Sequence, residues 1–408
     1  MPFPVSYMGK KRHIAPLVVD VVSNARGGPL LDLFSGMCAV ASAVAPNRPV
    51  WCNDVQYFAA NVAAALFKSE APPPKSRDSA DLAYPYYSEN KKALVDRFQE
   101  HLEEEQNGLA TENVPYIDRL NNTLPHVATS VSLEREREHL ARDSKSFPYR
   151  LFSITFAGGY LGLYQSIEVD AIRYAADRLF EEGILSRESH RWFILALCQA
   201  VSKVSTTTGH FAQYIKIKDR NKRTYLSQRR KSVWVAWLGS LDHLAPICGG
   251  RWRTRNRVFQ EDAQSLLERL SSTADLPSII YADPPYTDDQ YSRYYHLYET
   301  LILYDYPRST GVGRYRAQRF SSHFSLKSKV REAFDHMIGG CAKLGSNLVV
   351  SYPENGLLPN AKRSILSLLR KYFSHGEIAR LVPHQHSSLG ASKGKEKYSV
   401  TEMIFFAR

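Results

Sequence analysis

Asp283, Pro284, Pro285 and Tyr286 directly follow a short apolar run at residues 279–282. Two consecutive prolines cannot continue a strand or an ordinary helix, because neither has a backbone N–H to donate. They would hold a carboxylate and a proline carbonyl in fixed positions. Two such acceptors could take both hydrogens of the exocyclic amine of adenine and stabilise the positive charge that develops when this poor nucleophile attacks. Tyr286 could stack on a base removed from a duplex.

Polar groups also follow three other apolar runs that the sequence predicts to be strands. They are Asp32 with Phe34, Ser35 and Gly36, then Asn53-Asp54, and Glu261-Asp262. Ligands of open α/β sheets bind beyond the carboxyl ends of the strands, where a glycine allows close approach and an acid suits ribose hydroxyls. The set predicts a site for a nucleoside-containing cofactor. Each feature alone has a structural explanation, since the glycine could serve a turn and Asp54 could cap a helix.

Strands and helices alternate at both ends of the chain, which predicts an α/β fold with a doubly wound, mostly parallel sheet. The predicted strands cover residues 29–34, 48–55, 257–263, 277–286, 346–352 and 399–408. Predicted helices between them cover residues 13–25, 39–46, 56–69, 264–272, 328–345 and 360–373. A proline-rich boundary near residue 70 opens a middle region with its own helical patterns. We therefore expect a cofactor-binding half at 1–67, a large, mostly helical insertion at 68–250 and a catalytic half at 251–408.

The charge balance indicates a polyanionic partner. The chain has 53 Lys and Arg against 41 Asp and Glu, a formal net charge of +12. The basic residues concentrate between residues 203 and 257, interleaved with aromatic side chains, as on a surface that tracks DNA phosphates. The candidate DNA contacts are Lys216, Lys218, Arg220, Lys222, Arg223, Arg229, Arg230, Arg251 and Arg253. Trp234 and Trp237, at helical spacing, are more typical of a core.

Residues 283–286 match in full the catalytic motif of the adenine-specific (N6) DNA methyltransferases, and the chain resembles the members with the order cofactor half, recognition region, catalytic half, such as restriction-modification methylases. Residues 32–36 resemble their cofactor loop, although Cys38 stands where the family has a second glycine. Asp54 resembles the acid that binds the ribose, and Asp262 the acid near the cofactor adenine. Tyr7 and Lys11 stand at the matching places of the N-terminal aromatic-x-Gly-x-Lys element.

The resemblance implies a Rossmann-like methyltransferase sheet whose last strand is antiparallel, with an inserted target-recognition domain. It also implies S-adenosyl-L-methionine as methyl donor and a flipped adenine in double-stranded DNA as acceptor. Two alternatives keep the chemistry and change the acceptor: adenine in RNA, or the N4 amine of cytosine in DNA. A third is a catalytically silent DNA-binding protein. Tyr294, Tyr295 and His296 could line the target pocket or pack in the core.

Further expectations concern the setting of the protein. Five cysteines lie singly without a Cys-x-x-Cys pair, so we expect a reducing cytoplasm, no disulfide framework and no metal site. No apolar run approaches the length of a membrane span, so no membrane partner is expected. The protein would associate with the nucleoid when bound to DNA, and a restriction nuclease or another defence protein is a candidate partner. The recognition sequence and the oligomeric state are left open.

Overall fold

The described residues of the computed structural model, which are residues 5, 11–124, 134–305, 309–387 and 397–408, form a seven-stranded sheet with the strand order β3-β2-β1-β4-β7-β9-β8. β1, β2, β3, β4 and β7 are parallel, and β9 is antiparallel to both β7 and β8. This confirms the predicted doubly wound sheet with an antiparallel last strand. The strands are β1 (Leu30–Asp32), β2 (Val50–Asn53), β3 (Arg257–Phe259), β4 (Ile279–Ala282), β7 (Asn347–Pro353), β8 (Gly376–Ser387) and β9 (Lys397–Ala407).

Helices cover both faces of the sheet, so every residue of β1, β2 and β4 is buried. Successive residues of a strand serve opposite faces: Leu30 packs with one apolar cluster and Leu31 with the other. The cluster of Leu30 includes α1 (Ala15–Ser23), α2 (Ala39–Val44) and α3 (Tyr57–Lys68). The cluster of Leu31 includes α14 (Ala263–Leu270), α17 (Val330–Lys343) and α18 (Ala361–Tyr372).

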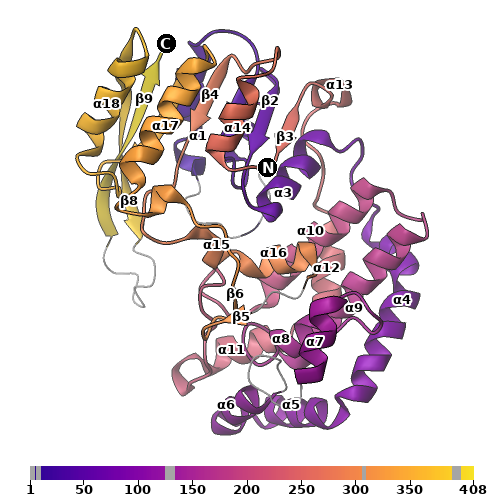
Figure 1. The fold of residues 1–408 in the computed structure, drawn as a ribbon. Coiled ribbons are helices and arrows are strands. Elements are labelled where there is room, and N and C mark those ends of the chain that lie inside the picture. Colours follow the sequence, from indigo (N-terminus) through magenta and orange to yellow (C-terminus); the bar gives the residue numbers. More distant parts are fainter. Residues whose placement is uncertain (1–4, 6–10, 125–133, 306–308, 388–396) are drawn as a thin grey trace.

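A mostly helical region follows α3 and lies beside the sheet (Figure 1). Its helices are α4 (Ser76–Arg97), α5 (Gln99–Thr111), α6 (Val114–Thr123), α7 (Glu134–Arg142), α8 (Leu151–Thr155), α9 (Leu163–Glu181), α10 (Arg187–Val204), α11 (Lys222–Arg229), α12 (Val233–Leu241) and α13 (Gly250–Arg253). Trp237 is fully buried and donates its indole N–H to the Phe193 carbonyl over 3.0 Å. The core interpretation is confirmed for Trp237, whereas Trp234 is partly buried and stacks on Tyr87 against the core.

The chain that follows residues 283–286 leaves the sheet and packs on the helical region. It forms α15 (Tyr291–Tyr294), α16 (His296–Leu303) and the hairpin of β5 (Ser309–Thr310) and β6 (Tyr315–Arg316). Tyr304 is fully buried there, donates to Asp170 over 2.6 Å and stacks on Tyr149. The helical region is therefore built from two parts of the chain, although the sequence assigns residues 291–316 to the catalytic half. Figure 1 shows α15 and α16 between the sheet and the other helices.

Two further findings complete the fold. The sequence prediction did not identify β8, whose residues pair with β9 at the edge of the sheet. Among the described helices, none has both the length and the apolar character of a membrane span.

Candidate active site

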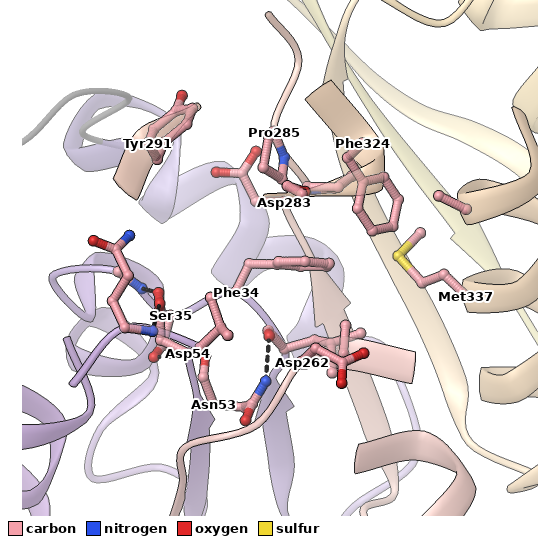
Figure 2. Close-up of a pocket in the computed structure, with 18 of the residues that line it drawn as sticks. Phe34, Ser35, Asn53, Asp54, Asp262, Asp283, Pro285, Tyr291, Phe324 and Met337 are labelled. Carbon is pink, nitrogen blue, oxygen red and sulfur yellow. Dashed lines mark hydrogen bonds between the residues drawn. The ribbon is translucent and has the colours of Figure 1, made fainter. Parts of the chain in front are cut away.

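The carboxyl ends of the parallel strands open into a cavity of about 600 Å³. This volume lies within the range of about 300–1,000 Å³ that is typical of cofactor and ligand sites. The lining includes all the described residues that the sequence predicts for catalysis and cofactor binding, which are Lys11, Asp32, Phe34, Ser35, Gly36, Asp54, Asp262, Asp283, Pro284, Pro285 and Tyr286. Figure 2 shows Asp54, Asp262 and Asp283 arranged around Phe34. Tyr7 lies outside the described residues.

The loop after β1 is tied to the end of β2. The backbone N–H of Ser35 donates to the Asn53 carbonyl over 2.8 Å, and that of Gly36 donates to the Asp54 carboxylate over 3.0 Å. Gly36 has a φ of +46°, which a glycine adopts without strain. Cys38 also has a positive φ, +59°, so it takes the left-handed conformation, which a glycine adopts more readily. The loop thus keeps a glycine-like backbone at a cysteine.

Asp54 and Asn53 order the neighbouring strand ends. One Asp54 oxygen accepts from Gly36 and the other from the N–H of Gln56 over 2.9 Å. Burial raises the pKa of Asp54 to about 6, while these backbone donors oppose the rise. The Asn53 amide donates to the carbonyls of Leu33 and Glu261, each over 3.1 Å. This single side chain therefore joins the ends of β1, β2 and β3.

Asp32 presents a polar atom without a partner. Its side chain is 2% exposed, and its Oδ1 has no hydrogen-bond partner among the described residues. Burial, and next the charge of Asp283, raise the pKa of Asp32 to about 8. A buried oxygen without a partner is unfavourable, so a donor on a ligand would satisfy it. Asp262 differs, because it caps α14 by accepting from Gln264 and Ser265 over 3.1 and 3.2 Å.

Asp283 lies in a buried cluster of charges. The Lys11 ammonium is 3.0 Å from Oδ1 of Asp283 and 2.6 Å from Oε1 of Glu402 in β9. The hydroxyl of Ser351 also donates to Asp283, over 3.2 Å. Burial raises the pKa of Asp283 to about 6, Lys11 opposes the rise, and Glu402 adds to it. Burial disfavours the charge of Lys11, but the two acids outweigh burial and raise the pKa of Lys11 above its usual value.

Aromatic side chains line the cavity beside the cluster of charges. The Lys11 ammonium is 5.4 Å from the centroid of the Tyr286 ring. The backbone carbonyl of Tyr286 accepts a hydrogen bond from the N–H of Leu357 over 2.9 Å. Phe34 meets Phe324 edge to face, with the centroids 5.4 Å apart. Tyr291 also lines the cavity. The sequence prediction missed Glu402, Ser351, Phe324 and Tyr291, because no motif or local spacing connects them with the predicted site.

The basic residues that the sequence predicts to contact DNA include both buried and exposed side chains. Arg229 and Arg253 are 6% and 8% exposed, and they donate to the backbone carbonyls of Gly159 and of Cys248 and Glu70, respectively. Their predicted role as phosphate contacts is therefore corrected: both brace the helical region. Lys222 and Arg230 form ion pairs with Glu112. Arg230 is nevertheless exposed, as are Lys216, Lys218, Arg220, Arg223 and Arg251, which form no ion pair with a described acid.

The stretch of residues 294–296 packs in the core and does not line the cavity. Tyr294 is 4% exposed, and Tyr295 and His296 are fully buried. Burial lowers the pKa of His296 to about 3, and its Nε2 lies 3.1 Å from the Phe211 carbonyl. Of the two alternatives that the sequence left open for this stretch, packing is the one observed.

The parallel sheet, its antiparallel last strand and the acids at the strand ends are consistent with a Rossmann-like methyltransferase fold. The model of the D12 class N6 adenine-specific DNA methyltransferases matches residues 7–131 and 254–365. The chain belongs to this family. The matched segments leave out much of the helical region, residues 132–253.

The chain is also similar to curated proteins that are named as methylases or methyltransferases. Modification methylase LlaI of Lactococcus lactis subsp. lactis is 24% identical over 405 residues, which cover 98% of this chain and 54% of the relative. Type II methyltransferase M.FokI of Planomicrobium okeanokoites is 26% identical over 300 residues, 70% of this chain and 42% of the relative. Modification methylase StsI of Streptococcus sanguinis is 21% identical over 407 residues, which cover 98% of this chain and 51% of the relative. The chain thus spans about half the length of these relatives.

The raised pKa of Asp32 predicts a pH-dependent stability. An acid whose pKa is raised to about 8 by folding binds its proton more tightly in the folded state, so stability falls as the pH rises from about 4 to about 8. Asp32→Asn does not titrate and should escape this loss. We expect the free energy of unfolding of the variant, relative to wild type, to increase by at least about 1.4 kcal/mol between pH 5 and pH 8, the equivalent of one pKa unit.

Urea denaturation at several pH values, without cofactor, would measure this difference. Asp275→Asn is the matched control, since Asp275 is exposed and pairs with Arg257. Parallel pH curves for wild type and Asp32→Asn would contradict the predicted pKa of Asp32.

Proposed function

We propose that the protein transfers a methyl group from S-adenosyl-L-methionine to the N6 amine of an adenine that is flipped out of double-stranded DNA. Family membership supports the reaction class. The observation that carries the proposal is the position of Asp283, which lines the same cavity as the loop after β1 and Asp54 and is held by Lys11 at 3.0 Å. An acceptor for an amine thus lies next to a site suited to a nucleoside.

The cavity fits such a cofactor. Phe34 offers an aromatic face, Gly36 allows close approach, and the free oxygen of Asp32 can accept from a ligand. Asp54 suits the ribose hydroxyls and Asp262 the amino group of the adenine, through lone pairs that their backbone bonds leave unused. S-adenosyl-L-methionine would supply a methyl group activated by a positively charged sulfur. Asp54 and Asp283, whose pKa values are about 6, would be ionised near pH 7 and match that charge.

Residues 283–286 would act on the target base. The Asp283 carboxylate and the Pro284 carbonyl accept the two amine hydrogens, which favours a tetrahedral nitrogen with a usable lone pair. When the nitrogen forms its bond to the methyl carbon, the bond from that carbon to the sulfur would break and leave its electron pair on the sulfur. The nitrogen would become positively charged and then lose a proton. A carboxylate with a pKa of about 6 can stabilise that charge and accept the proton. The prolines keep the acceptors in place, and Tyr286 stacks on the ring.

The proposed substrate and partners are based on surface charge and on the names of the relatives. The exposed cations Lys216, Lys218, Arg220, Arg223 and Arg251 suit DNA phosphates. The relatives LlaI and StsI are named modification methylases, which favours a restriction-modification setting with a nuclease as partner, in the cytoplasm. RNA adenine and the N4 amine of cytosine remain the alternative acceptors, because both present a similar amine to Asp283.

Incubation with cofactor carrying a labelled methyl group, and separately with duplex DNA, single-stranded DNA and RNA, tests the proposal. We expect label in duplex DNA and none after the substitution Asp283→Ala. Label in RNA alone would contradict the DNA assignment. Absence of label from every pool, with the cofactor bound, would favour the catalytically silent DNA-binding protein.

A further inference from the structure

Two arginines outside the predicted DNA contacts gather on one aromatic ring. The guanidinium carbon of Arg293 is 5.6 Å from the centroid of the Tyr315 ring, and that of Arg319 is 5.2 Å from it. The Tyr315 hydroxyl donates to the Ala212 carbonyl, which fixes the ring against the helical region. The ring offsets part of the repulsion between the two cations, because an aromatic face attracts positive charge.

Both arginines adjoin residues that line the cavity. Arg293 follows Ser292, Arg319 precedes Phe320, and Ser292 and Phe320 belong to the cavity lining. The Ser292 hydroxyl donates to the Phe320 carbonyl over 2.7 Å, which holds the two segments together. Both arginine side chains are half-buried, so a ligand from solvent can reach them. The pair thus stands at the edge of the cavity that would receive the target base.

The hydrogen-bonding capacity of this pair is only partly used within the described part of the chain. The Nε of each arginine is buried and has no partner there. Arg319 donates to the Arg316 carbonyl over 2.9 Å, and neither arginine forms an ion pair with a described acid. Two neighbouring acids are engaged elsewhere: Asp305 pairs with Arg316 over 2.6 Å, and Asp289 is hydrogen-bonded to Tyr294.

An anion would resolve this arrangement. Arginine keeps its charge at every physiological pH, and a ligand from solvent would reach these guanidinium groups through their terminal nitrogens, because the Nε atoms are buried. The planar guanidinium binds phosphate oxygens through two parallel N–H groups. We propose that Arg293 and Arg319 together bind one backbone phosphate of the DNA, next to the nucleotide that enters the cavity. This proposal rests on the proposed function, because it takes DNA as the substrate.

The dependence of DNA binding on salt tests the proposal. Each neutralised phosphate contributes about 0.9 to the slope of log K against log salt concentration. We expect the double variant Arg293→Gln/Arg319→Gln to lose about 0.9 from the slope for duplex DNA. The variant Arg370→Gln is the matched control, because Arg370 is exposed on α18, remote from the cavity, and should keep the wild-type slope.

Two further measurements separate this role from a structural one. The double variant Arg293→Lys/Arg319→Lys keeps both charges and should retain the slope, and calorimetric titration with cofactor should show an intact cavity in all variants. If the arginines only brace Tyr315, the Gln variant would melt at a lower temperature with an unchanged slope, which would overturn the proposal. A wild-type protein that neither binds nor methylates DNA would instead refute the proposed function.

Discussion

Asp283→Asn is expected to lower kcat by about 10²–10³-fold, the cost of removing one preorganised electrostatic group from an active site. Asn keeps the size of the side chain and one oxygen, but it loses the charge that would stabilise the methylated amine. It also loses the ion pair with Lys11, whose ammonium is 3.0 Å away. Cofactor affinity should stay close to that of wild type, because the proposed cofactor contacts lie on β1 and in the loops after β1, β2 and β3.

Single-turnover transfer to duplex DNA at saturating cofactor would measure the chemical step, and calorimetric titration would measure cofactor affinity. Asp275→Asn, which alters an exposed acid remote from the cavity, should leave both quantities unchanged. If Asp283→Asn kept wild-type transfer, the carboxylate would not act on the amine and the assignment of residues 283–286 would be wrong.

Lys11→Met should have the second-largest effect, on stability and on pH dependence together. Removing the cation leaves the carboxylates of Asp283 and Glu402 buried together, so we expect a loss of about 3–5 kcal/mol in the free energy of unfolding. Lys11 holds the pKa of Asp283 down. Activity requires the ionised carboxylate and is lost as the pH falls through about 6 in wild type. Without Lys11 this loss should begin at a higher pH.

Glu402→Gln is the opposite control. Glu402 raises the pKa of Asp283, so its neutral analogue should move the acidic limb of the kcat profile to lower pH. Urea denaturation measures the stability of each variant. Measurement of kcat across pH 5–8 gives the pH at which activity is lost on the acidic side of the profile. Shifts of the limb in the same direction for Lys11→Met and Glu402→Gln would contradict this electrostatic account.

The sheet could be predicted from the sequence because its signals are local. Strands β1, β2 and β4 are short apolar runs that end in acids, and the helix periodicity between them is clear. The same locality explains the prediction that residues 32–36, 54, 262 and 283–286 would meet, since parallel strands bring their carboxyl ends to one edge. The structure places them around one cavity.

The missed features depend on contacts that are remote in the sequence. Glu402 reaches Lys11 across 391 residues, because β9 inserts between β7 and β8, and no local pattern reveals this. Burial of Arg229 and Arg253 was also invisible, because a basic stretch looks the same whether its arginines face water or backbone carbonyls. The packing of residues 291–305 and 309–316 on the helical region could not be predicted either, because their apolar pattern does not show which surface they cover.

Identification of the methylated nucleoside in duplex DNA, by mass spectrometry after digestion, tests the central claim most directly. DNA from an unmethylated host, treated with the protein and S-adenosyl-L-methionine, should yield N6-methyladenine, and the Asp283→Asn variant should yield almost none in the same time. Two results would contradict the claim. One is N4-methylcytosine as the product, and the other is methylation of RNA without any methylated nucleoside in the DNA.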